Sequence, residues 1–143
     1  MTRFEFFVNG KPQAQGNHRI AKRSRFSKSK LYDSNKNLKQ WRRVVARAAV
    51  AEGWVDRDLL DGPVQLSLDF YYPRPKSHYC KGGLRKNASP WPHKTGSDLD
   101  KLVRAIGDAL TGVVWTDDRR IVWCTSTRNW GSCHGVRVTV HWV

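Results

Sequence analysis

Hydrophobic and polar residues alternate in four stretches of the chain, and this period of two residues predicts β-strands. The stretches are residues 4–8, 64–71, 121–127 and 136–142. Residues 129–132 lie in the connection between the last two and resemble a turn, so these two stretches are expected to pair as a β-hairpin. The pattern therefore predicts a sheet built from strands at both ends of the chain.

Two other stretches repeat their apolar residues at spacings of three and four, which is the period of an α-helix. In the first, residues 34–52, Trp41 and Val45 share one face. Ser34 or Asn35 is expected to lie near its N-terminal cap. Because the tryptophan face needs burial, this helix is expected to cover the sheet.

The second helix is expected to begin at about Asp98 and to end at Gly112, with an extended segment beginning at residues 113–115. Ser97 is predicted as its N-cap, and Asp100 as the residue that closes the capping box. Its apolar stripe consists of Leu99, Leu102, Val103, Ile106 and Leu110. This stripe is expected to pack against the core.

The order of these elements predicts the fold class. Strand, helix, strand, long loop, helix, strand and strand indicate an α+β domain with a mixed or antiparallel sheet and helices on one face. With 143 residues, the chain is expected to form a single domain over residues 1–143. That domain would include a basic loop at 18–31, a long basic loop at 72–96 and an aspartate block at 97–118.

Hydropathy and the number of cysteines indicate the cellular compartment in which the protein is expected. No apolar run approaches the ~20 residues that cross a bilayer, and the first residues lack a secretory apolar segment. Cys80, Cys124 and Cys133 are odd in number and unevenly spaced, so they are expected to be unpaired and mostly buried. We therefore expect a cytoplasmic protein with no membrane partner.

The formal net charge of +14 favours a polyanionic partner, and nucleic acid is the usual one. A solvated surface and an anionic membrane are the alternatives. Trp130, near the predicted turn, could stack on an exposed base. The residues expected to contact phosphates are Arg19, Lys22, Arg23, Arg25, Lys28, Lys30, Arg74, Lys76 and Lys101.

Acidic residues are concentrated in the aspartate block, which holds five of the chain's 12. If the chain folds back after the helix, Asp98, Asp100 and Asp118 could converge. Carboxylates without histidine or thiolate favour a hard cation such as Mg²⁺ or Mn²⁺. The alternative is structural, because Asp stabilises helix N-termini and is common in turns.

The aspartate block closely resembles the signature of the RusA family of Holliday-junction resolvases, which is often found in phages and prophages. The matching positions are Asp98-Leu99-Asp100, Leu102, Asp108-Ala109-Leu110, Gly112 and Asp117-Asp118. Weaker resemblances are Gly10-Lys11-Pro12 and the segment 71–77. Lys101 and Arg104 depart from the family pattern, which has Asn and Lys there.

The resemblance implies a catalytic set: Asp98, Asp100 and Asp118 as metal ligands, Asp117 as a helper and Arg104 as the cation that faces the phosphate. It also implies Mg²⁺, or alternatively Mn²⁺, as the cofactor, with no small-molecule cofactor. The implied protein is a homodimeric endodeoxyribonuclease that makes paired symmetric cuts in four-way DNA junctions. The alternatives are a non-catalytic DNA-binding protein of the same fold and a nuclease that acts on RNA.

Overall fold

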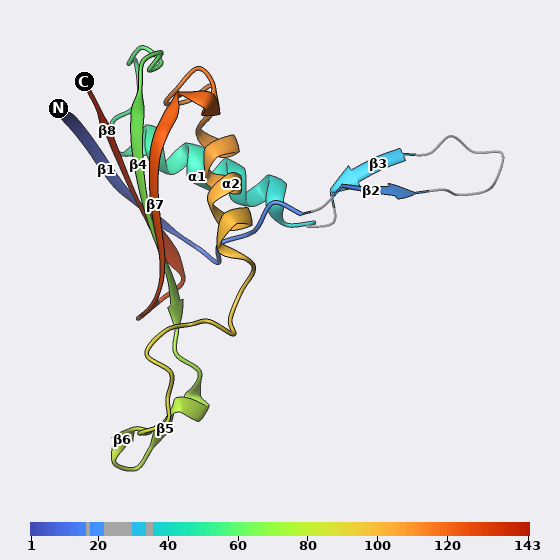
Figure 1. The fold of residues 1–143 in the computed structure, drawn as a ribbon, viewed down its shortest axis with the longest axis vertical. Helices are drawn as coiled ribbons and strands as arrows, with labels where there is room; N and C mark the ends of the chain where they lie inside the picture. Colours follow the sequence, from blue (N-terminus) through green and yellow to red (C-terminus); the bar gives the residue numbers. More distant parts are fainter. Residues whose placement is uncertain (17, 22–29, 34–35) are drawn as a thin grey trace.

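A mixed four-stranded sheet forms the centre of the computed structural model, which describes residues 1–16, 18–21, 30–33 and 36–143. The strand order is β1-β8-β4-β7, with antiparallel pairing of β1 with β8 and of β8 with β4, and parallel pairing of β4 with β7. These strands are β1 (Thr2–Asn9), β4 (Val64–Pro73), β7 (Ile121–Gly131) and β8 (Gly135–Trp142). The predicted mixed sheet is confirmed (Figure 1).

One face of this sheet is covered by both long helices, α1 (Leu38–Ala51) and α2 (Leu99–Leu110) (Figure 1). Alternate side chains of β4 point into this layer and are at most 1% exposed, and those between them are partly exposed. Leu102, Ile106 and Leu110 of α2 are fully buried in the same core. The α+β class and the apolar stripe of α2 are therefore confirmed.

The helix starts differ from the expected ones. Asn37 is the N-cap of α1, and Ser34 and Asn35 lie outside the described residues. Asp98 is the N-cap of α2, and no side-chain hydrogen bond caps this end. The predicted capping box beginning at Ser97 is therefore wrong.

The predicted hairpin of the last two strands is also wrong. Although only residues 132–134 separate β7 from β8, β4 lies between them in the sheet. The ten-residue β4 pairs with β8 on one side and with β7 on the other, and its inward side chains are all buried. Burying this apolar strand at the centre of the sheet removes more apolar surface from water than a local hairpin would.

Residues 113–115 do not form the expected extended segment. The amides of Val113 and Val114 both donate to the carbonyl of Leu110, at 3.0 and 2.9 Å, which closes a turn directly after α2. Trp115 is fully buried, and its indole Nε1 donates to Thr111 Oγ1 at 3.1 Å. Burial of this ring holds the chain close to the end of the helix.

Both predicted basic loops contain secondary structure. In the first, β2 (His18–Ala21) pairs antiparallel with β3 (Lys30–Asp33), so the expectation of a loop is wrong for these residues. The second contains a 3₁₀ turn, η1 (Lys76–His78), and a short hairpin of β5 (Tyr79–Cys80) and β6 (Gly83–Leu84).

We call residues 74–95 the arm, because this segment extends past the end of the sheet (Figure 1). None of the helices in the described part of the chain is both long and apolar enough to cross a bilayer.

Candidate active site and nucleic-acid interface

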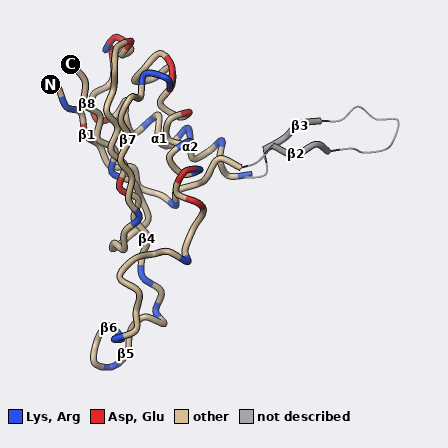
Figure 2. Tube along the Cα trace, in the orientation of Figure 1, with Lys and Arg blue, Asp and Glu red and all other residues tan. Residues whose placement is uncertain are grey.

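Acidic residues lie near both ends of α2 (Figure 2). At the N-terminal end, Asp98 and Asp100 are exposed, and the side chain of Asp98 is 75% accessible. Its carboxylate lies 3.8 Å from the ammonium of Lys101 and makes no capping hydrogen bond. Capping therefore does not account for this aspartate, and its oxygens are accessible to a ligand.

The C-terminal end of α2 is tied to α1. Asp108 accepts a hydrogen bond from the guanidinium of Arg42 at 3.1 Å, and both side chains are about one third exposed. Arg42 also donates to the side-chain oxygen of Gln15, and the backbone N–H of Gln15 donates to the carbonyl of Lys101 at 3.0 Å. Arg42 therefore links the loop after β1 to both helices, a role that no local sequence signal indicated.

Asp117 and Asp118 lie at the second 3₁₀ turn, η2 (Asp118–Arg120), where Asp117 is the N-cap. Asp117 accepts hydrogen bonds from the backbone and the guanidinium of Arg119, which lower the pKa of its carboxyl to about 2. A hydrogen bond with Asp117 raises the pKa of Asp118, and the nearby charges of Asp117 and Asp108 raise it further. Ile121, which directly follows η2, lies 3.9 Å from the position of a Cβ on Gly107, so Asp118 lies beside the C-terminal end of α2.

The expected metal-ligand set divides between the two ends of the helix. Asp98 and Asp108 are ten positions apart, which is about 15 Å along a helix axis. Carboxylates are the donors that Mg²⁺ prefers, so these residues fit the metal in kind. In arrangement, the described part of the chain contains no group of three or more His, Cys, Asp or Glu side chains placed to hold a metal ion. The ligand set of Asp98, Asp100 and Asp118 stays a prediction.

Arg104, the predicted phosphate-facing cation, is exposed on α2. It lies one turn after Asp100 and one turn before Asp108, on the same line of the helix. Asp108 takes its ion pair from Arg42 rather than from this neighbour. Arg104 therefore stands between the two acidic groups with its guanidinium accessible.

Arg74 holds the arm to the sheet. Its guanidinium donates to the carbonyl of Ser89 at 3.0 Å and lies over the ring of Trp130, 5.2 Å from the centroid. The indole of Trp130 donates to the same carbonyl at 2.9 Å and packs edge-on against His78. Arg74 and Trp130, both expected to contact nucleic acid, are thus engaged with the protein itself.

Other predicted phosphate contacts are distributed over the molecule. Lys76 is exposed in η1, and the side chain of Lys101 is 31% exposed. Arg19 lies in β2 and Lys30 in β3. Lys22, Arg23, Arg25 and Lys28 lie outside the described residues. Figure 2 shows further basic residues along the arm, where Lys81, Arg85, Lys86 and Lys94 are exposed.

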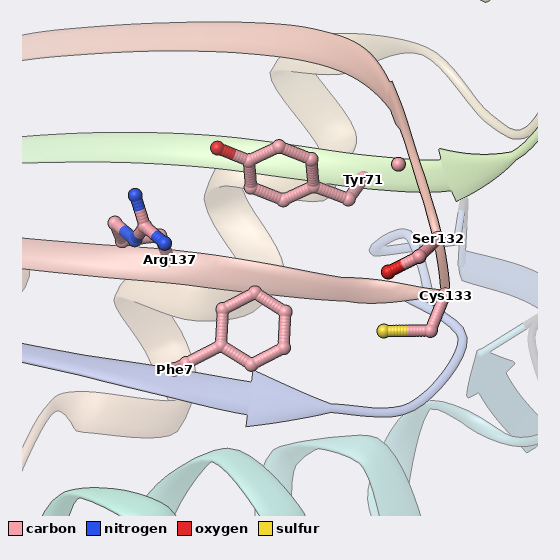
Figure 3. Close-up of a pocket in the computed structure, with 6 residues that line it drawn as sticks. Phe7, Tyr71, Ser132, Cys133 and Arg137 are labelled. Carbon is pink, nitrogen blue, oxygen red and sulfur yellow. The ribbon is translucent and has the colours of Figure 1, made fainter.

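A depression of about 360 Å³ lies on the sheet face opposite the helices (Figure 3). Phe7, Tyr71, Cys133 and Arg137 line it, and none of the predicted catalytic residues contributes. All three cysteines of the chain are free and exposed, so their expected burial is wrong. We assign this depression no part in the candidate site.

A basic α+β chain that exposes carboxylates on a helix beside a cationic arm has the features of a nucleic-acid-processing protein. The family described as "Endodeoxyribonuclease RusA" matches residues 9–141, and the chain belongs to this family. The chain is also similar to "Uncharacterized protein YqaN" of Bacillus subtilis (strain 168), with 31% identity over 127 residues. The alignment covers 82% of this chain and 81% of that protein. The resemblance seen in the aspartate block is thus confirmed, and the family is one of DNA endonucleases.

Proposed function

We propose that this protein resolves four-way DNA junctions by hydrolysing phosphodiester bonds in two symmetric cuts, with a divalent cation as cofactor. Its membership of the RusA family supports the reaction class. Its biological setting would be the cytoplasm of a bacterial or phage-infected cell, in recombination, repair or phage DNA processing.

One observation supports a catalytic role for the aspartate block above all. Asp98 occupies the N-cap of α2 but does not cap it, and its side chain is 75% exposed. A structural aspartate at this position would accept a hydrogen bond from the first turn. The helix N-terminus also favours an ionised carboxylate, which is the form that binds a cation. Asp98 and Asp100 are therefore suited to a ligand.

Different residues of the chain would bind the metal, stabilise the phosphate and hold the DNA. Asp98 and Asp100 would hold Mg²⁺ or Mn²⁺ at the N-terminal end of α2, and Asp118, with Asp117 assisting, would offer ligands at the C-terminal end. Such a cation supplies an activated water and stabilises charge on the leaving oxygen. Arg104 would offset negative charge on the phosphate under attack. The exposed cations of the arm would hold the DNA backbone, which positions the junction without reading its bases.

A homodimer would suit this substrate. A four-way junction has strands related by a two-fold axis, and a two-fold dimer presents two identical sites to them. Paired cuts at symmetric positions then require no second binding event.

The test is cleavage of a synthetic four-way junction, a matched linear duplex and a structured RNA, each with Mg²⁺, with Mn²⁺ and with EDTA. Paired nicks near the branch point that require the divalent ion are expected for the junction, and denaturing gels resolve them. Cleavage of structured RNA in preference to the junction would overturn the choice of substrate. A light-scattering mass of two chains would support the dimer.

A second candidate is a DNA-binding protein that retains the fold without catalysis. It is favoured by the division of the acids between two ends of α2, which leaves no three-acid group placed for a metal among the described residues. Tight junction binding without cleavage in either ion would establish it. In that case, reverting Lys101 to Asn and Arg104 to Lys tests whether these departures from the family pattern suppress activity.

A further inference from the structure

Two of the seven tryptophans have large exposed surfaces: Trp91 is 61% and Trp123 is 62% exposed. Trp41, Trp54 and Trp115 are buried in the core, and the other two are partly buried. Exposing an indole to water is unfavourable, so a large exposed indole in a defined setting is a candidate for contact with a ligand. The settings of the two exposed rings differ.

Trp91 lies in the arm on a backbone that is fixed locally. The hydroxyl of Ser89 donates to the carbonyl of Trp91 at 2.7 Å, and the amide of His93 donates to the same carbonyl at 2.9 Å. Pro90 and Pro92 flank the tryptophan, and each proline restricts its own φ. An aromatic ring held on a restrained backbone loses little conformational entropy when it binds.

The same segment is anchored to the sheet. The carbonyl of Ser89 accepts hydrogen bonds from Arg74 at 3.0 Å and from the indole of Trp130 at 2.9 Å. Trp130 belongs to β7, and Arg74 directly follows β4. Trp91 is therefore two residues from a point that is fixed to two neighbouring strands, and seven residues before Asp98.

Charge identifies the class of ligand. Residues 71–97 contain six lysines and arginines and no acidic residue. Apart from Arg74, these cations are exposed. Exposed aromatic rings among cations that follow a phosphate backbone are the combination that binds unpaired nucleotides, because every base offers a face for stacking. A stacked duplex offers such faces only at its ends and at branch points.

We propose that Trp91 stacks on a nucleobase that is unstacked at the branch point, with the cations of the arm on the adjoining phosphates. This inference rests on the proposed function and deepens it, because it assigns the choice of branched over linear DNA to one side chain. Trp130, whose indole is held by Ser89 and covered by Arg74, is not the stacking residue.

The experiment measures binding in EDTA, so that cleavage does not enter. The ligands are a four-way junction with 2-aminopurine at the branch point, a linear duplex and single-stranded DNA. The proteins are the wild type, Trp91→Ala, Trp91→Phe and Trp123→Ala, the last as a matched control of equal exposure. Circular dichroism and thermal unfolding verify that each variant is folded.

For Trp91→Ala we expect junction and single-strand affinity to fall about 5- to 150-fold, and duplex affinity to stay unchanged. Trp91→Phe should retain most of the affinity, because its ring still stacks. The 2-aminopurine fluorescence should be quenched by the wild type and by Trp91→Phe, but not by Trp91→Ala. Trp123→Ala should behave as the wild type.

Three outcomes would overturn the inference: junction affinity unchanged in Trp91→Ala, an equal loss on the duplex, or an equal loss in Trp123→Ala. The proposed function fails separately. A wild type that quenches 2-aminopurine through Trp91 but cuts no junction in Mg²⁺ or Mn²⁺ would refute resolution alone. A wild type that cuts junctions while Trp91→Ala binds them normally would refute the stacking role alone.

Discussion

The two ends of α2 carry acidic residues in opposite electrostatic settings. At the N-terminal end the helix dipole is positive and stabilises the charges of Asp98 and Asp100. At the C-terminal end the dipole is negative, and Asp108 lies in a last turn that contains no basic residue. The compensating cation comes from another helix, since Arg42 of α1 forms the ion pair with Asp108.

This difference distinguishes acids that are open to a ligand from acids that hold the structure together. The side chain of Asp98 is 75% exposed, whereas that of Asp108 is 35% exposed and paired. Asp117 is likewise held by Arg119. Side-chain changes at Asp98 and Asp100 should therefore affect catalysis, and loss of the ion pair between Arg42 and Asp108 should affect stability.

The largest effect is expected for Asp100→Asn. Neutralising this carboxylate should lower the rate of junction cleavage by at least about 100-fold, because a cation site contributes several kcal/mol to the transition state. Binding in EDTA and thermal stability should remain as in the wild type. Asp58→Asn, at another exposed aspartate, is the control. Undiminished cleavage by Asp100→Asn in limiting Mg²⁺ would remove this residue from the mechanism.

Gly96→Ala tests whether the packing of the backbone before α2 positions Asp98 and Asp100. Gly96 has a φ of +79°, and a Cβ there would lie 2.7 Å from the hydroxyl of Tyr72, which is 1% exposed. Gly112 has a similar φ of +81° with open space around it. We expect Gly112→Ala to lower the free energy of unfolding by about 1–2 kcal/mol. Gly96→Ala should cost about 1–3 kcal/mol more.

Urea denaturation measures the unfolding free energies of both glycine variants, and the junction assay measures their cleavage. Gly96→Ala should also lose cleavage, because the shifted segment leads directly into Asp98. Equal destabilisation by the two substitutions would show that contact with Tyr72 does not constrain the backbone at residue 96.

Arg42→Ala tests the role of the ion pair with Asp108 at the C-terminal end of α2. Losing the ion pair with Asp108 and the contact with Gln15 should lower the free energy of unfolding by about 1 kcal/mol, a modest value because both charged partners are about one third exposed. Arg43→Ala, at the exposed neighbouring position, should change it little. Cleavage per folded molecule should stay constant. A catalytic loss with unchanged stability would show that the ion pair between Arg42 and Asp108 serves catalysis rather than stability.

The smallest effect is expected for Lys101→Ala. If its ammonium, 3.8 Å from Asp98, contacts one phosphate, the salt dependence of duplex binding should lose about 0.9 from its slope. Lys39→Ala, at an exposed position of α1, is the matched control. Binding titrations at several salt concentrations give both slopes. Identical slopes for the wild type and Lys101→Ala would show that the ammonium of Lys101 contacts no phosphate.

Local sequence patterns predicted the helices and strands better than they predicted which strands pair with each other. The burial of Leu102, Ile106 and Leu110 followed from helical spacing, because this periodicity depends only on neighbouring residues. The position of β4 between β7 and β8 could not be predicted in this way, because pairing between strands far apart in the chain leaves no local signature. The helix cap was misplaced by one residue, from Asp98 to Ser97.

The candidate site shows the same division. The sequence located the exposed acids of α2 and the basic character of the arm. It did not indicate that Arg42 reaches Asp108, 66 residues away, or that Arg74 packs on Trp130. These contacts depend on how layers meet in three dimensions, and an isolated arginine in a basic chain gives no hint of its partner.

The central position of β8 bears on how the chain reaches its native state. β8 is the last strand in chain order, yet it pairs with both β1 and β4, so the first strand has no partner in the sheet until the last is made. During synthesis, the backbone N–H and C=O groups of β1 and of one edge of β4 therefore lack their strand partner until β8 is made. Such non-local pairing slows folding. We expect the sheet to assemble only after residues up to Trp142 have left the ribosome, which makes chaperone protection of the nascent chain advantageous.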